Sequence, residues 1–334
     1  MKISILLPYK ENFSPEYPGA VSLFVYETSK ISKFKKTLTI FGNTDYKKRF
    51  NLKYVNINLK KNLFSSQTNL YVKKFIELEK NINSSIIEMH NRPSYIHLIN
   101  SKINNKILTL YFHNDPLSMS GSKTIEQRKS LLKTCYKIIF NSSWSKKRFL
   151  EGLENKFVNS NKLLIFYQSA QKGHLSLIKN KRKWITFVGK LNKAKGFDIF
   201  AKSIVKILNK NPSWKAKIIG DEKREKIHLK HKNAELLGFK KHDEVINIFK
   251  KTSITVACSR WDEPFGRTSL EASANGCAVI ITNKGGLPET VTDAKIISNL
   301  NEKKLTSTIS LLIKDNNLSK KLQALSIKNF SLTN

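Results

Sequence analysis

The sequence lacks the features that mark membrane-spanning proteins, proteins built on disulfides or zinc, and proteins with an Asp-x-Asp metal site. It has no uninterrupted run of about 20 apolar residues, so no membrane-spanning helix is expected. Its cysteines, Cys135, Cys258 and Cys277, lie far apart, which excludes a zinc-type ligand spacing and a paired disulfide framework. No Asp-x-Asp pair follows a predicted strand, so no metal site is expected. These absences fit a protein of the reducing cytoplasm.

Acidic residues are also scarce, because 25 Asp and Glu face 60 Lys and Arg and give a net charge of +35. Such an excess suggests binding to nucleic acid or to an anionic membrane surface. The lysines are nevertheless spread along the whole chain, and only eight of the basic residues are arginine. Lys, Asn and Ile share A/T-rich codons, so codon bias is an equally good explanation. No zinc-knuckle, KH-type or aromatic RNA-binding pattern occurs, and we expect no nucleic-acid partner.

Short apolar runs alternate with helical patterns from end to end. The first run, residues 3–7, is too short for a signal peptide and is expected to be a buried strand. Helices are expected at residues 20–31, 71–81 and 124–134. Such alternation predicts βαβ units and parallel sheets. The remaining expected strands are residues 37–41, 85–90, 107–113, 137–141, 163–166, 184–188, 215–219, 234–237, 253–257 and 278–282.

A basic, weakly patterned stretch interrupts this alternation at residues 169–183 and is interpreted as a linker. We therefore expect an α/β protein of two facing Rossmann-like domains with an interdomain cleft. The N-terminal domain would span residues 1–172 and the C-terminal domain residues 183–334. In such sheets ligands bind beyond the carboxyl ends of the strands, so the chemistry is expected in the loops that follow them.

One such loop, residues 259–266, follows the expected strand at 253–257. Pro264 and Gly266 favour a turn, and a helical pattern starts near Thr268. The exposed amides of a helix N-terminus bind anions. Glu263 in the loop and Glu271 in the helix could accept hydrogen bonds from sugar hydroxyls. The alternative is a helix cap beside a solvated glutamate.

A second strand–glycine–helix turn occupies residues 187–197. Lys190 follows the strand end directly, and Lys195 stands at the start of the next helix. Two cations at this place could bind a diphosphate and stabilise its departure. The alternative is that both are ordinary solvated lysines in a lysine-rich chain.

Together these segments resemble the retaining glycosyltransferases of family 4, which have the GT-B architecture. The hallmark of that family is Glu-x7-Glu, which Glu263 and Glu271 match. Its Gly-Arg-Leu…Lys-Gly diphosphate motif resembles residues 189–191 and 195–196, with Lys190 in place of the usual arginine. Residues 285–289, Gly-Gly-Leu-Pro-Glu, also match the family's turn after the strand at 278–282.

The resemblance implies roles for residues of the C-terminal half. Glu263 would contact the donor hexose and Glu271 the ribose hydroxyls. Gly189, Lys190 and Lys195 would hold the diphosphate. The remaining donor-binding residues implied by the resemblance are Phe265, Gly266 and Arg267, through their amides, and Phe239, near the nucleobase.

Polar residues follow the N-terminal strands as well. Gly19 lies in the loop after the first strand, where the family has a glycine-containing loop that approaches donor and acceptor. His113 resembles the family's histidine near the reacting sugar. Arg92 and Asn114 follow strand ends and are candidate acceptor-binding residues. Arg148 could bind an acceptor phosphate, but we interpret it as a surface residue.

The resemblance implies hexosyl transfer from a nucleotide sugar to a saccharide or glycolipid acceptor, with retention of anomeric configuration. With Lys190, Lys195 and a helix N-terminus available, the leaving diphosphate is expected to need no metal ion. The nucleotide sugar is a co-substrate, and no cofactor is expected. We expect a role in cell-envelope polysaccharide or lipopolysaccharide synthesis, with the protein cytoplasmic or docked at the inner membrane face through basic residues such as the lysine pairs at 35/36, 60/61 and 73/74. A nucleotide-sugar epimerase of the same architecture and a non-catalytic basic surface-binding protein are the alternatives.

Overall fold

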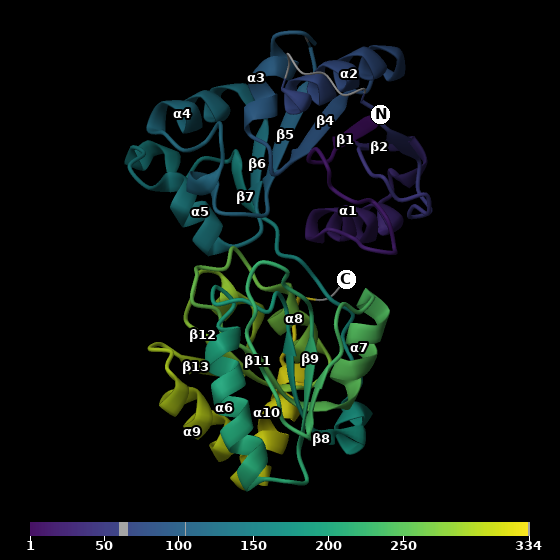
Figure 1. The fold of residues 1–334 in the computed structure, drawn as a ribbon. Coiled ribbons are helices and arrows are strands. Elements are labelled where there is room, and N and C mark those ends of the chain that lie inside the picture. The colour runs from purple at the N-terminus through teal and green to yellow at the C-terminus, as the bar shows by residue number, and fades with distance from the viewer. Residues whose placement is uncertain (60–65, 104, 333–334) are drawn as a thin grey trace. The chain divides into compact units, whose positions relative to one another are not determined.

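The computed structural model describes residues 1–59, 66–103 and 105–332. The chain divides into two compact units, Met1–Tyr167 and Gln168–Asn334, coloured purple to teal and teal to yellow in Figure 1. Each unit is a parallel β-sheet with helices packed on its faces, as βαβ connections require. This is the α/β class expected from the alternating pattern.

The described residues of the first unit form a seven-stranded parallel sheet in the order β3-β2-β1-β4-β5-β6-β7 (Figure 1). The chain order reverses between β1 and β4, which pair side by side at the centre of the sheet. The strands are β1 (Ile3–Leu6), β2 (Leu38–Gly42), β3 (Tyr54–Asn56), β4 (Ile86–His90), β5 (Ile107–Phe112), β6 (Lys137–Phe140) and β7 (Leu163–Ile165), and the α-helices are α1 (Ala20–Ile31), α2 (Gln67–Ile82), α3 (Ser94–Asn100), α4 (Ile125–Thr134) and α5 (Ser143–Leu150).

Successive side chains of β1 supply two different cores, because they point to opposite faces of the sheet. Ile5 packs with Val21 and Phe24 of α1. Leu6 packs with Phe75 of α2 in the larger cluster on the other side. A sheet that is covered on both faces needs strands with continuous apolar runs, and this is why the central strands are easy to recognise in the sequence.

The second unit contains a six-stranded parallel sheet among its described residues, in the order β10-β9-β8-β11-β12-β13. Helices α6 and α9 pack on one face, and α7 and α8 pack on the other. The strands are β8 (Arg182–Val188), β9 (Lys215–Ile219), β10 (Ala234–Leu236), β11 (Thr252–Ala257), β12 (Ala278–Thr282) and β13 (Ala294–Ile297), and the helices are α6 (Phe197–Lys210), α7 (His242–Lys251), α8 (Arg267–Ala274), α9 (Glu302–Lys314) and α10 (Asn316–Lys328).

The structure differs from the sequence-based expectation in two places. Strands β3 and β13 were not expected; both are short edge strands in which at most one side chain is buried, so their pattern is weak. The stretch at 169–183, expected to be a linker, packs against the second unit instead. Gly173 N donates to Ala274 O at 2.8 Å, and Lys181 Nζ donates to Phe249 O at 2.8 Å and to Asn275 O at 2.7 Å.

None of the described helices is both long and apolar enough to cross a bilayer.

Glu79 of α2 is a fully buried carboxylate that fastens the helix to the sheet. It accepts hydrogen bonds from the hydroxyl of Ser4 on β1 and from the amide and hydroxyl of Ser84, just before β4. Such a group is costly to bury unless its oxygens are hydrogen-bonded, so its partners depend on it in turn.

We predict that Glu79→Leu lowers the free energy of unfolding by about 1–3 kcal/mol, because it leaves the Ser84 amide and two hydroxyls buried without an acceptor. Glu77→Leu on the same helix is the control, since Glu77 is exposed and pairs only with Lys74 there; its effect should stay within about 1 kcal/mol. Urea denaturation of both variants measures the difference. Equal effects would contradict the structural role given to Glu79.

Candidate functional site

The second unit has a switch point between β8 and β11. From β8 the chain first builds β9 and β10 on one side of the sheet and then returns to place β11 on the other. The turn after β8 and the loop after β11 therefore leave the same edge of the sheet side by side. Ligands of doubly wound sheets bind at such a position.

Lys195 and Glu263 meet at this edge. Lys195 Nζ lies 2.5 Å from Glu263 Oε1, and the same carboxylate oxygen accepts a hydrogen bond from the Ser259 hydroxyl. The Lys195 side chain is 29% exposed and that of Glu263 only 10%. The ring of Trp261 lies beside the ammonium group, with 5.4 Å from Nζ to the ring centroid. The structure thus pairs a cation and a carboxylate to which the sequence analysis gave different roles in one donor site.

Glu271 lies one turn into α8 and is buried. Its Oε1 accepts from Arg267 Nε at 2.6 Å and is 2.8 Å from His242 Nε2. Burial alone would raise the pKa of Glu271, but Arg267 and His242 outweigh it and hold that pKa below its ordinary value. The carboxylate is therefore charged at neutral pH. Sequence reasoning missed His242, which starts α7 and carries no motif of its own.

The backbone of the Glu263 loop is fixed from the opposite side. Gly286 N donates to Glu263 O at 2.6 Å. Gly285 adopts φ +59°, and a Cβ at this residue would lie 2.1 Å from Glu263 O. The Gly-Gly turn after β12 is thus the surface on which the Glu263 loop rests.

Gly266 and the buried Phe265 lead into α8, whose first amides have no partner within the helix. A helix N-terminus of this kind can bind an anion, as the sequence analysis expected of this segment. Gly189 joins the ends of β8 and β9, since its amide donates to Ile219 O at 3.0 Å. Lys190 is exposed, and its side chain has no partner among the described residues. Phe239 is 41% exposed in the turn after β10.

In the first unit, a chain of ring and carboxylate contacts ends at His113. His113 Nε2 lies 2.8 Å from His90 Nδ1, and His90 Nε2 lies 2.7 Å from Glu88 Oε1. The His113 ring also stacks on Tyr111, with 4.4 Å between ring centroids. Burial, together with the neighbouring His90, holds the pKa of His113 well below its ordinary value. His113 is therefore neutral at pH 7.

Asn91 contacts three of the four candidate residues of this unit. Its side-chain oxygen accepts from the amides of His113, at 2.9 Å, and Asn114, at 3.0 Å. Arg92 Nη1 donates to Asn91 O at 2.7 Å. The structure therefore joins Arg92, His113 and Asn114 through a residue whose left-handed backbone, at φ +56°, the sequence did not reveal.

Gly19 has a different immediate function, because it gives room to the Glu11 carboxylate. Glu11 Oε1 accepts from Ser22 N at 2.9 Å near the start of α1. A Cβ at Gly19 would lie 1.9 Å from the same oxygen. Burial raises the pKa of Glu11. Gly19 thus allows a carboxylate to cap the first turn of α1, which is a local structural role.

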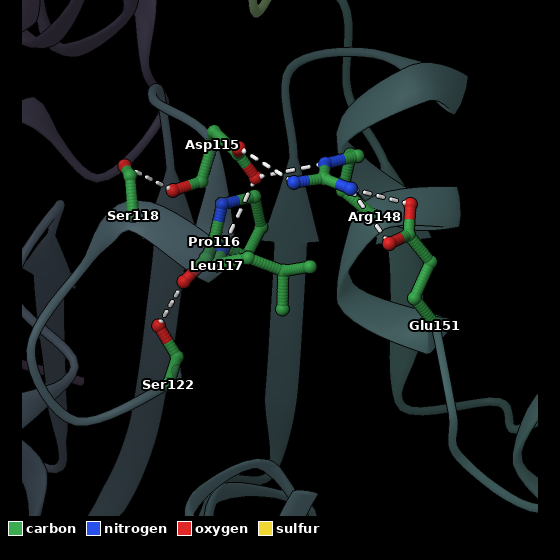
Figure 2. A network of polar contacts seen from close by, with 7 residues as sticks. All are labelled: Asp115, Pro116, Leu117, Ser118, Ser122, Arg148 and Glu151. Atoms are coloured by element: carbon green, nitrogen blue, oxygen red, sulfur yellow. Dashed lines mark hydrogen bonds and ion pairs between the residues drawn. The ribbon is translucent and has the colours of Figure 1, made fainter. Parts of the chain in front are cut away.

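Arg148 holds the segment that follows Asn114 (Figure 2). Its guanidinium donates to both carboxylate oxygens of Asp115, at 3.3 and 3.1 Å, and to those of Glu151, at 2.7 and 2.6 Å. Asp115 Oδ1 also accepts from Leu117 N at 3.1 Å. Arg148 is thus more than the surface residue we expected, since it fixes the loop beyond β5 to α5.

The described residues contain no group of three His, Cys, Asp or Glu side chains that could hold a metal ion.

The chain is similar in sequence to known glycosyltransferases. Residues 174–328 match the family described as Glycosyl transferases group 1. Spore coat protein SA of Bacillus subtilis (strain 168) is 21% identical over an alignment 326 positions long, which covers 88% of this chain and 84% of that protein. The lipopolysaccharide core biosynthesis mannosyltransferase LpsB of Rhizobium meliloti (strain 1021) is 29% identical over an alignment 121 positions long, which covers 33% of this chain and 34% of LpsB.

Among solved structures, the chain resembles Anabaena HepE in complex with UDP-glucose, with a TM-score of 0.75 and 16% sequence identity over 98% of this chain and 94% of HepE. This likeness shows that the chain has the GT-B fold. The family match covers the part of the chain that carries Lys195, Glu263 and Glu271. Fold and family match together support a GT-B glycosyltransferase.

We predict that Gly285→Ala disturbs the site more than Gly238→Ala. Both glycines have a left-handed backbone, with φ +59° and +64°, but a Cβ at Gly238 would meet nothing within 4 Å. Each alanine should cost about 1–2 kcal/mol of backbone strain. Gly285→Ala should cost about 1–3 kcal/mol more, because the new methyl group displaces the Glu263 backbone.

Thermal unfolding of the two variants measures this difference. Equal losses would show that the turn does not support the Glu263 loop.

Proposed function

We propose that this protein is a retaining, metal-independent glycosyltransferase of family 4. It transfers a hexose-type sugar from a nucleotide-sugar donor to a saccharide or glycolipid acceptor. The observation that carries this proposal is the meeting of Lys195, Glu263 and the α8 N-terminus at the switch point of the second sheet.

The donor can be placed group by group on this edge. Its diphosphate binds Lys195, Lys190 and the first amides of α8, which together offer full and partial positive charge. The ribose hydroxyls donate to Glu271, whose carboxylate is kept charged by Arg267 and His242. The hexose hydroxyls donate to Glu263. Phe239 contributes an exposed ring next to the nucleobase.

In this mechanism the protein stabilises the leaving diphosphate and does not supply a nucleophile of its own. As the bond from the sugar to the diphosphate breaks, negative charge grows on the phosphate oxygen, and Lys195 and Lys190 stabilise it. The departing phosphate oxygen takes the proton of the acceptor hydroxyl, and the acceptor oxygen bonds to the anomeric carbon on the face that the phosphate leaves, which retains the anomeric configuration. The family resemblance assigns His113 a role near the reacting sugar, and a neutral ring would add no positive charge to an oxocarbenium-like centre.

The test is release of nucleoside diphosphate from a nucleotide sugar with and without an acceptor, in the presence of excess EDTA. We expect release that depends on the acceptor and survives chelation. Activity lost on chelation and restored by Mg²⁺ or Mn²⁺ would contradict the metal-free mechanism. Change of the sugar without release of diphosphate would instead identify an epimerase.

Lys195→Ala should lower kcat/KM, with a loss of about 2–4 kcal/mol in transition-state stabilisation, because one electrostatic contact to the developing charge is removed. Lys193→Ala is the matched control, because Lys193 belongs to the same turn and is exposed. The control should keep wild-type kinetics. Wild-type kinetics in Lys195→Ala would refute the role of Lys195.

The acceptor is proposed to be a glycolipid or lipopolysaccharide-type saccharide at the inner face of a membrane. The net charge of +35 supports this, as does the similarity to LpsB, whose name places it in lipopolysaccharide core biosynthesis. Lys35, Lys36, Lys73 and Lys74 are exposed, and each basic residue near an anionic surface adds about 1 kcal/mol of attraction. The expected pair at 60/61 lies outside the described residues.

Vesicle co-sedimentation at about 0.15 M salt measures docking. We expect more protein on vesicles with anionic lipid than on neutral vesicles, and less binding as salt rises. Equal partitioning onto both would contradict a membrane-surface role and favour a soluble acceptor.

A further inference from the structure

The ion pair between Lys195 and Glu263 uses the same groups that a nucleotide sugar must use. Lys195 would bind the diphosphate, and Glu263 would bind the hexose. In the structure they bind each other, at 2.5 Å between Nζ and Oε1. Donor binding and this ion pair therefore compete for the same lysine and the same carboxylate.

The two partners differ in freedom. The Glu263 carboxylate is held by the Ser259 hydroxyl, its backbone oxygen is held by Gly286 N, and Ser259 O accepts in turn from the Thr282 hydroxyl at 2.7 Å. The Lys195 side chain is nearly three times as exposed, at 29% against 10%. An incoming diphosphate can thus draw Lys195 away, but Glu263 stays in place with its charge.

The negative charge left on Glu263 affects the binding of the nucleotide sugar and of the nucleoside diphosphate differently. A phosphate on Lys195 brings a second negative group close to the Glu263 carboxylate, which has lost its cation, and like charges at this distance repel. The hexose of a complete donor compensates by donating hydroxyl hydrogens to Glu263. A nucleoside diphosphate carries no hexose and leaves the carboxylate uncompensated.

We propose that the Lys195–Glu263 ion pair makes the site select the complete nucleotide sugar over the nucleoside diphosphate that remains after transfer. Glu263 then has two effects: it binds the hexose of the donor, and it weakens retention of the product. This inference rests on the proposed function, because it takes the donor to bind at this edge of the second sheet.

The proposal predicts that removing the charge of Glu263, a residue that binds the donor, strengthens binding of the nucleoside diphosphate. Glu263→Gln keeps the size of the side chain but removes its charge, which frees Lys195 for phosphate. We expect the variant to bind the nucleoside diphosphate roughly threefold to tenfold more tightly than the wild type. The nucleotide sugar should bind no more tightly, so the preference for the complete donor falls.

Isothermal titration with UDP, GDP and ADP, and with the glucose conjugate of each, first finds the pair that the wild type binds. That pair is then titrated into Glu263→Gln, Glu263→Asp and Glu271→Gln. Glu263→Asp keeps the charge and should leave the affinity for the nucleoside diphosphate unchanged while the donor binds more weakly. Glu271→Gln should weaken both ligands alike, since both contain the ribose. Glu263→Ala removes the same charge if the glutamine variant does not fold.

The supporting result is that Glu263→Gln binds the nucleoside diphosphate more tightly than the wild type, while Glu263→Asp does not. Suppose that the wild-type protein binds and turns over the donor, but Glu263→Gln binds the nucleoside diphosphate no more tightly than the wild type does. This result would overturn the present inference and leave the proposed function intact. A wild-type protein that binds none of these ligands would instead refute the proposed function.

Discussion

The parallel pairing of β8 with β11 is the constraint on which the donor site depends. Residues far apart in the chain become neighbours because Ile254, Thr255 and Val256 of β11 lie beside Ile185, Thr186 and Phe187 of β8. The turn that carries Lys195 and the loop that carries Glu263 leave these two strands at one edge. Their 2.5 Å contact follows from this strand order, as does the position of α8, whose N-terminus adds partial positive charge there.

In each unit, the surroundings of a buried titratable group set its protonation state. In the second unit, Arg267 and His242 keep Glu271 charged although it is buried. In the first unit, burial keeps His113 neutral, and Asn91 fixes the backbone on both sides of the bond between His113 and Asn114. Such networks lose more than one bond when a member is removed, since each partner is then left buried without its hydrogen bond.

Much of this arrangement could be predicted from the sequence, because central strands and strand-end motifs are local patterns. The strands at 215–219 and 278–282 have the expected bounds, and Lys195 and Glu263 were expected in one site. What the sequence could not reveal depends on tertiary contacts. His242 matters only because α7 lies beside α8, and Asn91 only because β4 ends beside β5. The stretch at 169–183 lacks a periodic pattern, so its packing on the second unit was missed.

The central claim is that a nucleotide sugar binds at the carboxyl edge of β8 and β11 and replaces the Lys195–Glu263 ion pair. A crystal structure of the protein with a bound nucleotide sugar measures this directly. The account predicts a diphosphate oxygen within hydrogen-bond distance of Lys195 Nζ, and hexose hydroxyls within hydrogen-bond distance of Glu263. A nucleotide sugar bound at this edge with the ion pair intact, or bound at another place in the chain, would contradict it.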